Sequence, residues 1–216
     1  PKVALLDPLL LQTLPAKLAA ATGMDALTHA IEAYVSRWST FITDALCRQN
    51  FRLVGRYLRR LVADSSDIEA AGAMLQASSM GAMAFNTARL GLVHAMSHPL
   101  GARFSIPHGV ACGVLLPHII RFNLISCPQK FIDIAVDLEG SARGATEMEK
   151  ASCAIEAVER LMRDVGISVD FSSIKITDEL LSTLADETLS SGMQLTNPRS
   201  VTKEEVMNIF LQLYRA

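Results

Sequence analysis

Residues 91–109 read GLVHAMSHPLGARFSIPHG and carry three of the chain's five histidines. Small and apolar residues surround His94, His98 and His108, so these imidazoles are expected to face something other than bulk water. Proline and glycine residues between His94 and His108 allow the chain to reverse direction there. One histidine alone is more often a buried core residue than a ligand, but three in one short stretch point to a shared site.

A second pair of candidate donors lies in residues 16–35, which are rich in Ala and Leu and predict a helix. Asp25 and His29 are four residues apart, which places both side chains on one face of that helix. Their neighbours are apolar, and a buried carboxylate without a partner is costly. By spacing alone, Asp25 and His29 could be an ordinary Asp–His pair on a helix. Their expected burial favours a bound cation or a hydrogen-bond network instead.

Together the two segments predict a metal site. One carboxylate and up to three imidazoles suit Fe²⁺, Zn²⁺, Co²⁺ or Mn²⁺, and ligand type does not choose among them. The set lacks the thiolates of a closed structural zinc site, and a site with an open position would be catalytic. Cys112 lies four residues after His108 and is a conceivable ligand, although a lone Cys in an apolar run favours a small buried residue. His118 is interpreted as structural.

Composition excludes several classes of protein. The 216 residues carry a formal net charge of −2 without a basic block, so neither nucleic acid nor an anionic membrane is expected as a partner. The apolar run 110–120 is too short to span a bilayer. The absence of a signal peptide at Pro1 and the scattered cysteines predict a cytoplasmic protein. The missing Met and the apolar surplus suggest a piece of a longer chain, partly covered by another domain or subunit.

Helical periodicity dominates after residue 15 and predicts an all-α fold of seven or eight helices. Capping boxes are expected at Ser66–Glu69, Thr146–Glu149 and Thr202–Glu205. Only residues 3–7 predict a strand, whose sheet would lie outside this chain. The predicted helices are 16–35, 41–62, 66–86, 109–123, 129–138, 146–166, 177–190 and 202–214. Two side-chain groups stand out: a basic face favouring solvent or an interface over a phosphate site (Arg48, Arg52, Arg56, Arg59, Arg60), and a stripe expected in the core (Met74, Met80, Met83).

Two long motifs resemble those of a known family. The run from Leu5-Leu6-Asp7 through Pro15 to Thr22-Gly23-Met24-Asp25-Ala26-Leu27 and Glu32 resembles the first signature of the iron-containing (group III) alcohol dehydrogenases. Residues 91–109 resemble their second signature, and Asn197-Pro198-Arg199 with Thr202–Glu205 resembles their C-terminus. The resemblance covers essentially the whole chain. It implies a helical, bundle-like domain of the dehydroquinate synthase-like/iron alcohol dehydrogenase type.

The resemblance also implies roles for residues. Asp25, His29, His94 and His108 correspond to the metal ligands, with Fe²⁺ or Zn²⁺ as the expected ion. His98 corresponds to the histidine near the nicotinamide that relays a proton. Two further residues correspond to the substrate pocket (Phe85 and, by a looser match, Met193). The implied reaction oxidises an alcohol to an aldehyde or ketone by hydride transfer to NAD(P), and its reverse.

One departure from the family pattern concerns domain organisation. Family members have an N-terminal α/β domain with a Gly-rich dinucleotide-binding turn, and this sequence has no G-x-G loop after a strand. Residues 1–216 are therefore expected to form a single all-α metal-binding catalytic domain, inactive without the absent nucleotide-binding domain. Expected partners are that domain, a small alcohol or aldehyde, and further copies of the chain. The alternatives are a metal-dependent lyase on the same scaffold, like dehydroquinate synthase, and a non-catalytic helical module.

Overall fold

The computed structural model describes residues 3–172 and 174–215 and shows an all-α fold. In that part of the chain there are nine α-helices, three short 3-10 helices and no strand. The 3-10 helices are η1 (Pro8–Leu11), η2 (Leu124–Ser126) and η3 (Met193–Thr196). The α-helices are α1 (Ala16–Val35), α2 (Phe41–Ala63), α3 (Ile68–Ala88), α4 (Leu92–Phe104), α5 (His108–Asn123), α6 (Pro128–Glu139), α7 (Glu147–Val165), α8 (Asp178–Ser190) and α9 (Lys203–Arg215).

The strand predicted at residues 3–7 is wrong. These residues have no regular secondary structure, and Val3 and Leu5 are exposed. Asp7 instead begins η1, where its Oδ1 accepts a hydrogen bond of 2.9 Å from the Leu9 amide. A strand forms only against a partner strand, and the described residues offer none.

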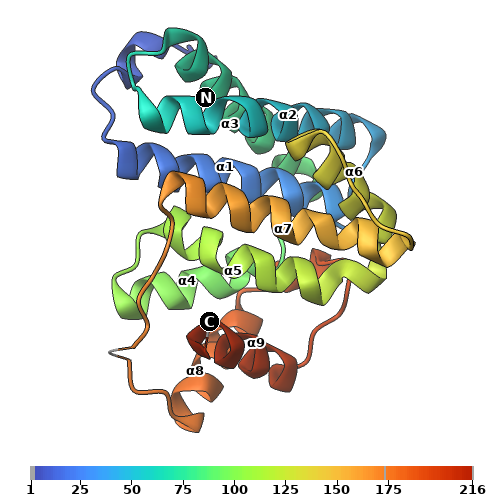
Figure 1. The fold of residues 1–216 in the computed structure, drawn as a ribbon. Coiled ribbons are helices and arrows are strands. Elements are labelled where there is room, and N and C mark those ends of the chain that lie inside the picture. The colour runs from blue at the N-terminus through green and yellow to red at the C-terminus, as the bar shows by residue number, and fades with distance from the viewer. Residues whose placement is uncertain (1–2, 173, 216) are drawn as a thin grey trace.

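The helices are stacked in layers, with α1 near the middle (Figure 1). α2 and α3 pack on one side of α1, and α5 packs on another. α4 packs on α5, and α8 and α9 continue the stack beyond α4 and α5. The buried apolar side chains form one contiguous cluster that runs through these layers. The middle of α1 is therefore enclosed by its neighbours.

Side-chain caps define the starts of several helices. Thr146 with Glu149 and Thr202 with Glu205 form the predicted reciprocal caps of α7 and α9. The box predicted at Ser66 is wrong, because Asp67 caps α3 by accepting from the Ala70 amide. The helix begins one residue later than the box requires.

A tight reversal joins α4 to α5. α4 continues through Pro99 to Phe104, and Ser105 then adopts a left-handed conformation with φ 54°. Pro107 precedes the first residue of α5, His108. The two helices pack against each other as a hairpin, so His94 and His108 end on neighbouring helices.

Helices α5 and α1 cross at very short distance near Gly109. A Cβ atom added at Gly109 would lie 2.0 Å from the backbone oxygen of Ala21. Only glycine allows this approach, which brings the start of α5 beside the middle of α1. His108, adjacent to Gly109, is thereby placed opposite the Asp25 turn of α1.

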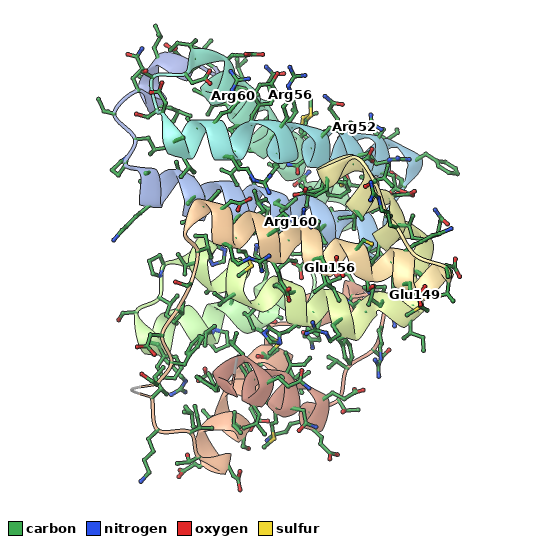
Figure 2. The ribbon with its side chains drawn as sticks, viewed as in Figure 1. Arg52, Arg56, Arg60, Glu149, Glu156 and Arg160 are labelled. Atoms are coloured by element: carbon green, nitrogen blue, oxygen red, sulfur yellow. The ribbon has the colours of Figure 1, made fainter. Side chains whose placement is uncertain are left out.

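The basic face of α2 is an intramolecular contact for most of its length. Arg48 and Arg52 both pair with Asp137 of α6, and Arg59 pairs with Glu139 of α6 and Asp164 of α7. Figure 2 shows Arg52, Arg56 and Arg60 along α2. These pairs satisfy the charges within the chain.

One further sequence expectation, the methionine stripe, changes in the structure, whereas the expectation of no membrane span does not. Met74 is buried, but Met83 is 59% exposed, so the methionine stripe is only partly core. The segment His108–Ser126 proves long and apolar enough to cross a membrane, and 67% of that window lies buried inside the fold. A core helix meets the same length and composition criteria, and α5 packs against α1, α4 and α7.

Candidate metal centre

Three ionisable residues occupy one face of α1. Asp25, His29 and Glu32 follow the spacing i, i+4, i+7, so they stack along two helical turns. The side chains of Asp25 and His29 are 23% and 19% exposed, and that of Glu32 is 4% exposed. Since the rest of the helix buries mainly Ala, Leu and Met, this polar face lies within an apolar surrounding.

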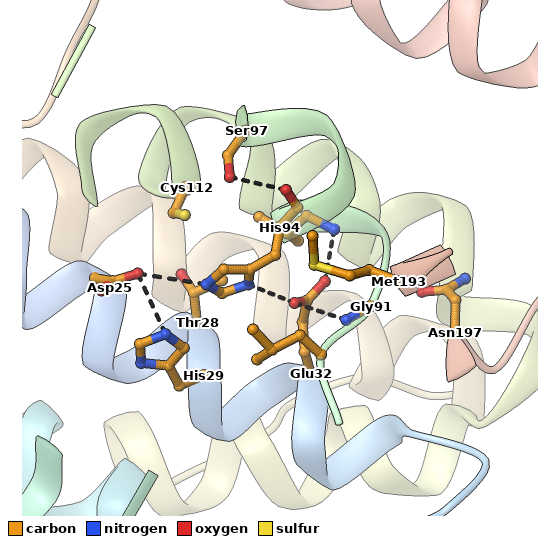
Figure 3. A network of polar contacts seen from close by, with 12 residues as sticks. Asp25, Thr28, His29, Glu32, Gly91, His94, Ser97, Cys112, Met193 and Asn197 are labelled. Carbon is orange, nitrogen blue, oxygen red and sulfur yellow. Dashed lines mark hydrogen bonds and ion pairs between the residues drawn. The ribbon is translucent and has the colours of Figure 1, made fainter. Parts of the chain in front are cut away.

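Three histidine nitrogens approach one oxygen of Asp25, and Figure 3 shows the two that belong to His29 and His94. The Nε2 atoms of His29, His94 and His108 lie 3.7, 3.5 and 3.4 Å from Asp25 Oδ1. α1 supplies Asp25 and His29, α4 supplies His94 and α5 supplies His108. The structure thus brings together the four residues that the sequence nominated as metal ligands.

The donor atoms fit a divalent cation. Asp25 Oδ1 and His94 Nε2 are buried and have no hydrogen-bond partner among the described residues. Unpaired buried polar atoms are rare, because each forfeits its hydration. Two ligand atoms held at about 2.1 Å from one tetrahedral ion lie about 3.4 Å apart, close to the separations found here. A carboxylate and neutral imidazoles are suitable donors for first-row divalent metals.

Glu32 holds His94 in place. Glu32 Oε2 lies 2.6 Å from His94 Nδ1 and accepts from the Gly91 amide at 3.0 Å, while Oε1 accepts from the Val93 amide. The carboxylate thereby satisfies amides at the N-terminus of α4. With Nδ1 bound to Glu32, Nε2 of His94 faces Asp25. Glu32 has no role predicted from the sequence motifs, although its i+7 position after Asp25 is a usable signal.

The charges of the cluster are strongly coupled. Burial alone would raise the pKa of Asp25, but the imidazoles of His108 and His94 hold it far below its ordinary value. Burial opposes protonation of His94, yet Glu32 and Asp25 raise its pKa to about 12. Asp25 and Cys112 raise the pKa of His108 to about 10. Burial lowers the pKa of His29 to about 4, so its imidazole is neutral at pH 7.

The two remaining histidines lie differently. His98 is exposed beside the cluster, with its ring centroid 5.5 Å from that of His108 and 6.4 Å from that of His94. Burial and the neighbouring His108 lower the pKa of His98. His118 is half-buried further along α5, next to Arg121 and Arg199, and does not join the cluster.

An apolar pocket of about 470 Å³ adjoins the cluster. Phe85 and Met193, the two residues assigned to a substrate pocket from the sequence, both line it, together with Trp38 and Leu195. The Phe85 ring centroid lies 4.7 Å from that of His29, so Phe85 connects the pocket wall to the cluster.

An all-α fold in which a carboxylate and three imidazoles converge from three helices defines a candidate metal-binding domain. The chain belongs to the Fe-containing alcohol dehydrogenase family, whose C-terminal family model matches residues 19–214. This agrees with the resemblance found in the sequence motifs.

Individual relatives support the same family. The chain is 44% identical over 214 residues to 1,3-propanediol dehydrogenase of Citrobacter freundii, covering 99% of this chain and 55% of the relative. It is 39% identical to the NAD-dependent methanol dehydrogenase of Bacillus methanolicus, covering 97% and 55%. A solved alcohol dehydrogenase from Oenococcus oeni superimposes with a TM-score of 0.91 at 39% identity, covering 96% and 54%. The chain therefore spans about half the length of the curated relatives it matches.

Proposed function

We propose that this chain is the catalytic metal-binding domain of an NAD(P)-dependent, iron-type alcohol dehydrogenase. The observation that carries the proposal is the convergence of three histidine Nε2 atoms within 3.7 Å of Asp25 Oδ1. Family membership supports it, because relatives are named as dehydrogenases of small alcohols.

Asp25, His29, His94 and His108 would hold the ion, which we propose to be Fe²⁺ or Zn²⁺. When bound there, such an ion supplies a Lewis acid for the oxygen of an alcohol or a carbonyl. Glu32 keeps the Nδ1 proton of His94 in a hydrogen bond and thereby directs Nε2 to the site. The imidazole of His29 is already neutral, so its nitrogen lone pair is available.

His98 is proposed to move the substrate proton between the site and solvent. Its side chain is exposed, and its ring lies beside that of His108. Burial lowers the pKa of His98, which keeps a neutral imidazole available as a proton acceptor. Nicotinamide would supply the hydride acceptor, and His98 is the residue of this chain that we place near it.

Phe85 and Met193 are proposed to contact the carbon chain of a small alcohol or aldehyde. Both line the apolar pocket, and Phe85 also packs on His29. An apolar wall at this place keeps water from the metal side of the pocket and favours small, weakly polar substrates.

Dinucleotide binding is proposed to belong to the half of the relatives that this chain does not span, with residues 1–216 acting as one metal-binding domain. Homo-oligomer formation and a cytoplasmic location, which fits the four free cysteines, complete the proposal.

The test is an assay of a protein that joins this chain to the part of its relatives that it does not span. NAD(P)-dependent oxidation of short alcohols is expected, together with its loss in Asp25→Ala. Phosphate elimination without nicotinamide turnover would instead support a dehydroquinate synthase-like lyase. Full activity of a metal-free Asp25→Ala protein would contradict the ligand assignment.

A further inference from the structure

Cys112 lies inside the donor cluster. It occupies α5 one turn after His108, so the two side chains share a helix face. Cys112 is fully buried, and its Sγ is 3.6 Å from His108 Nε2. Figure 3 shows its side chain beside those of Asp25 and His94. Cys112 belongs to the buried apolar cluster, and its thiol also meets ionisable side chains, including that of His108.

One compact set of donor atoms at the site includes this thiol. Asp25, His94, His108 and Cys112 each offer a ligand atom, and these atoms all lie within 4.8 Å of one another. His29 is not part of that set, although its Nε2 is 3.7 Å from Asp25 Oδ1. Ligand edges around a tetrahedral ion with one thiolate are about 3.4 to 3.7 Å long, and the Cys112–His108 separation of 3.6 Å matches.

A second observation points to a ligand at the same place. The His94 side chain is only 2% exposed, and its Nε2 has no hydrogen-bond partner within the described ranges. Its other ring nitrogen is held by Glu32, so Nε2 cannot turn away without losing that bond. The unpaired nitrogen therefore faces the space that Asp25, His108 and Cys112 also border.

We propose that the Cys112 thiolate is an additional ligand of the metal ion, beside Asp25, His29, His94 and His108. This inference rests on the proposed function, because it concerns the same metal site. The S–H proton passes to solvent as the metal–sulfur bond forms, and no electrons are transferred. The thiolate makes the donor set softer than one of oxygen and nitrogen alone, which favours Zn²⁺ or Co²⁺ over Mn²⁺.

Cobalt provides the test, because a thiolate bound to Co²⁺ gives an intense near-ultraviolet charge-transfer band that oxygen and nitrogen ligands do not give. The purified chain is stripped with a chelator and titrated with Co²⁺. The wild type is expected to show the band, and Cys112→Ser is expected to bind Co²⁺ without it. Cys127→Ser, which alters a half-buried cysteine remote from the cluster, is the matched control and should keep the band.

Each outcome has a definite meaning. Co²⁺ binding by the wild type without the band would overturn the inference while leaving the proposed metal site intact. A band that persists in Cys112→Ser would also overturn it. Failure of the wild type to bind any Co²⁺ would refute the metal site itself. If Cys112→Ser does not fold, Cys112→Ala replaces it.

Competition between Zn²⁺ and Mn²⁺ gives a second readout, in which the variant should lose zinc preference on the order of tenfold.

Discussion

The carboxylate of Glu32 in α1 is hydrogen-bonded to the imidazole of His94 in α4, with 2.6 Å between Glu32 Oε2 and His94 Nδ1. The same carboxylate accepts the amides of Gly91 and Val93. One buried side chain of α1 therefore fixes both the start of α4 and the ring orientation of a candidate metal ligand.

We expect Glu32→Gln to weaken metal binding by about 10- to 100-fold, the usual cost of losing a carboxylate behind a ligating histidine. The free energy of unfolding should fall by about 1 to 3 kcal/mol, because an amide cannot accept all three bonds. Metal titration and urea unfolding measure the two effects. Glu204→Gln, an exposed change in α9, is the control. Unchanged metal affinity in Glu32→Gln would refute the positioning role.

Metal affinity should rise with pH. Despite burial, Glu32 and Asp25 raise the pKa of His94 to about 12, and Asp25 with Cys112 raises that of His108 to about 10. Without metal, both imidazoles therefore carry an extra proton at pH 6–8, and an incoming cation must displace it. Raising the pH lowers the proton competition, so affinity should increase up to about tenfold per pH unit for each proton released. Titrations at several pH values in the presence of a metal buffer measure this slope. An affinity independent of pH would contradict the electrostatic description.

The crossing of α1 and α5 should tolerate no side chain at Gly109. Its added Cβ would meet the Ala21 oxygen at 2.0 Å, so Gly109→Ala should destabilise the fold by about 2 to 3 kcal/mol and weaken metal binding by moving His108. Gly72→Ala in α3 is the matched control, since its Cβ would meet only Pro8 at 3.8 Å. The control should be neutral or gain up to about 1 kcal/mol. Equal thermal stability of the two variants would show that the helices do not approach this closely.

The single tryptophan offers a direct probe of the proposed substrate pocket. Trp38 lines the pocket with Phe85 and Met193. Short alcohols should therefore change its fluorescence in a saturable way, and Phe85→Ala should raise the half-saturating concentration severalfold by removing apolar contact. Met83→Ala, an exposed change on the same helix as Phe85, should have no effect. A response that is identical in all three proteins would place the alcohol elsewhere.

The sequence predicted most of the fold because its signals are local. The apolar period of residues 16–35 and the Thr146 and Thr202 boxes fixed helices without knowledge of packing. The strand predicted at residues 3–7 failed for the opposite reason, since a strand depends on a partner. The prediction that Met83 lies in the core was wrong, because the spacing of methionines does not show which turns of α3 other helices cover.

The candidate site was predictable where one helix or one motif carries it. Asp25 and His29 share a helix face by spacing, and the motif resemblance added His94 and His108. The way in which α1, α4 and α5 cross determines the hydrogen bond between Glu32 and His94. It also determines how close Cys112 lies to the other donor atoms, and no local sequence pattern predicts this crossing. The Gly109–Ala21 approach that sets this crossing becomes visible only in three dimensions.

Metal content of the purified chain and of Asp25→Asn tests the central claim most directly. Asp25 Oδ1 lies within 3.7 Å of the Nε2 atoms of His29, His94 and His108, so its loss should remove the donor shared by all of them. After loading with Fe²⁺ or Zn²⁺ and desalting, elemental analysis should find one ion per wild-type chain and almost none in folded Asp25→Asn. Wild-type protein without bound metal, or Asp25→Asn with a full complement, would contradict the metal centre.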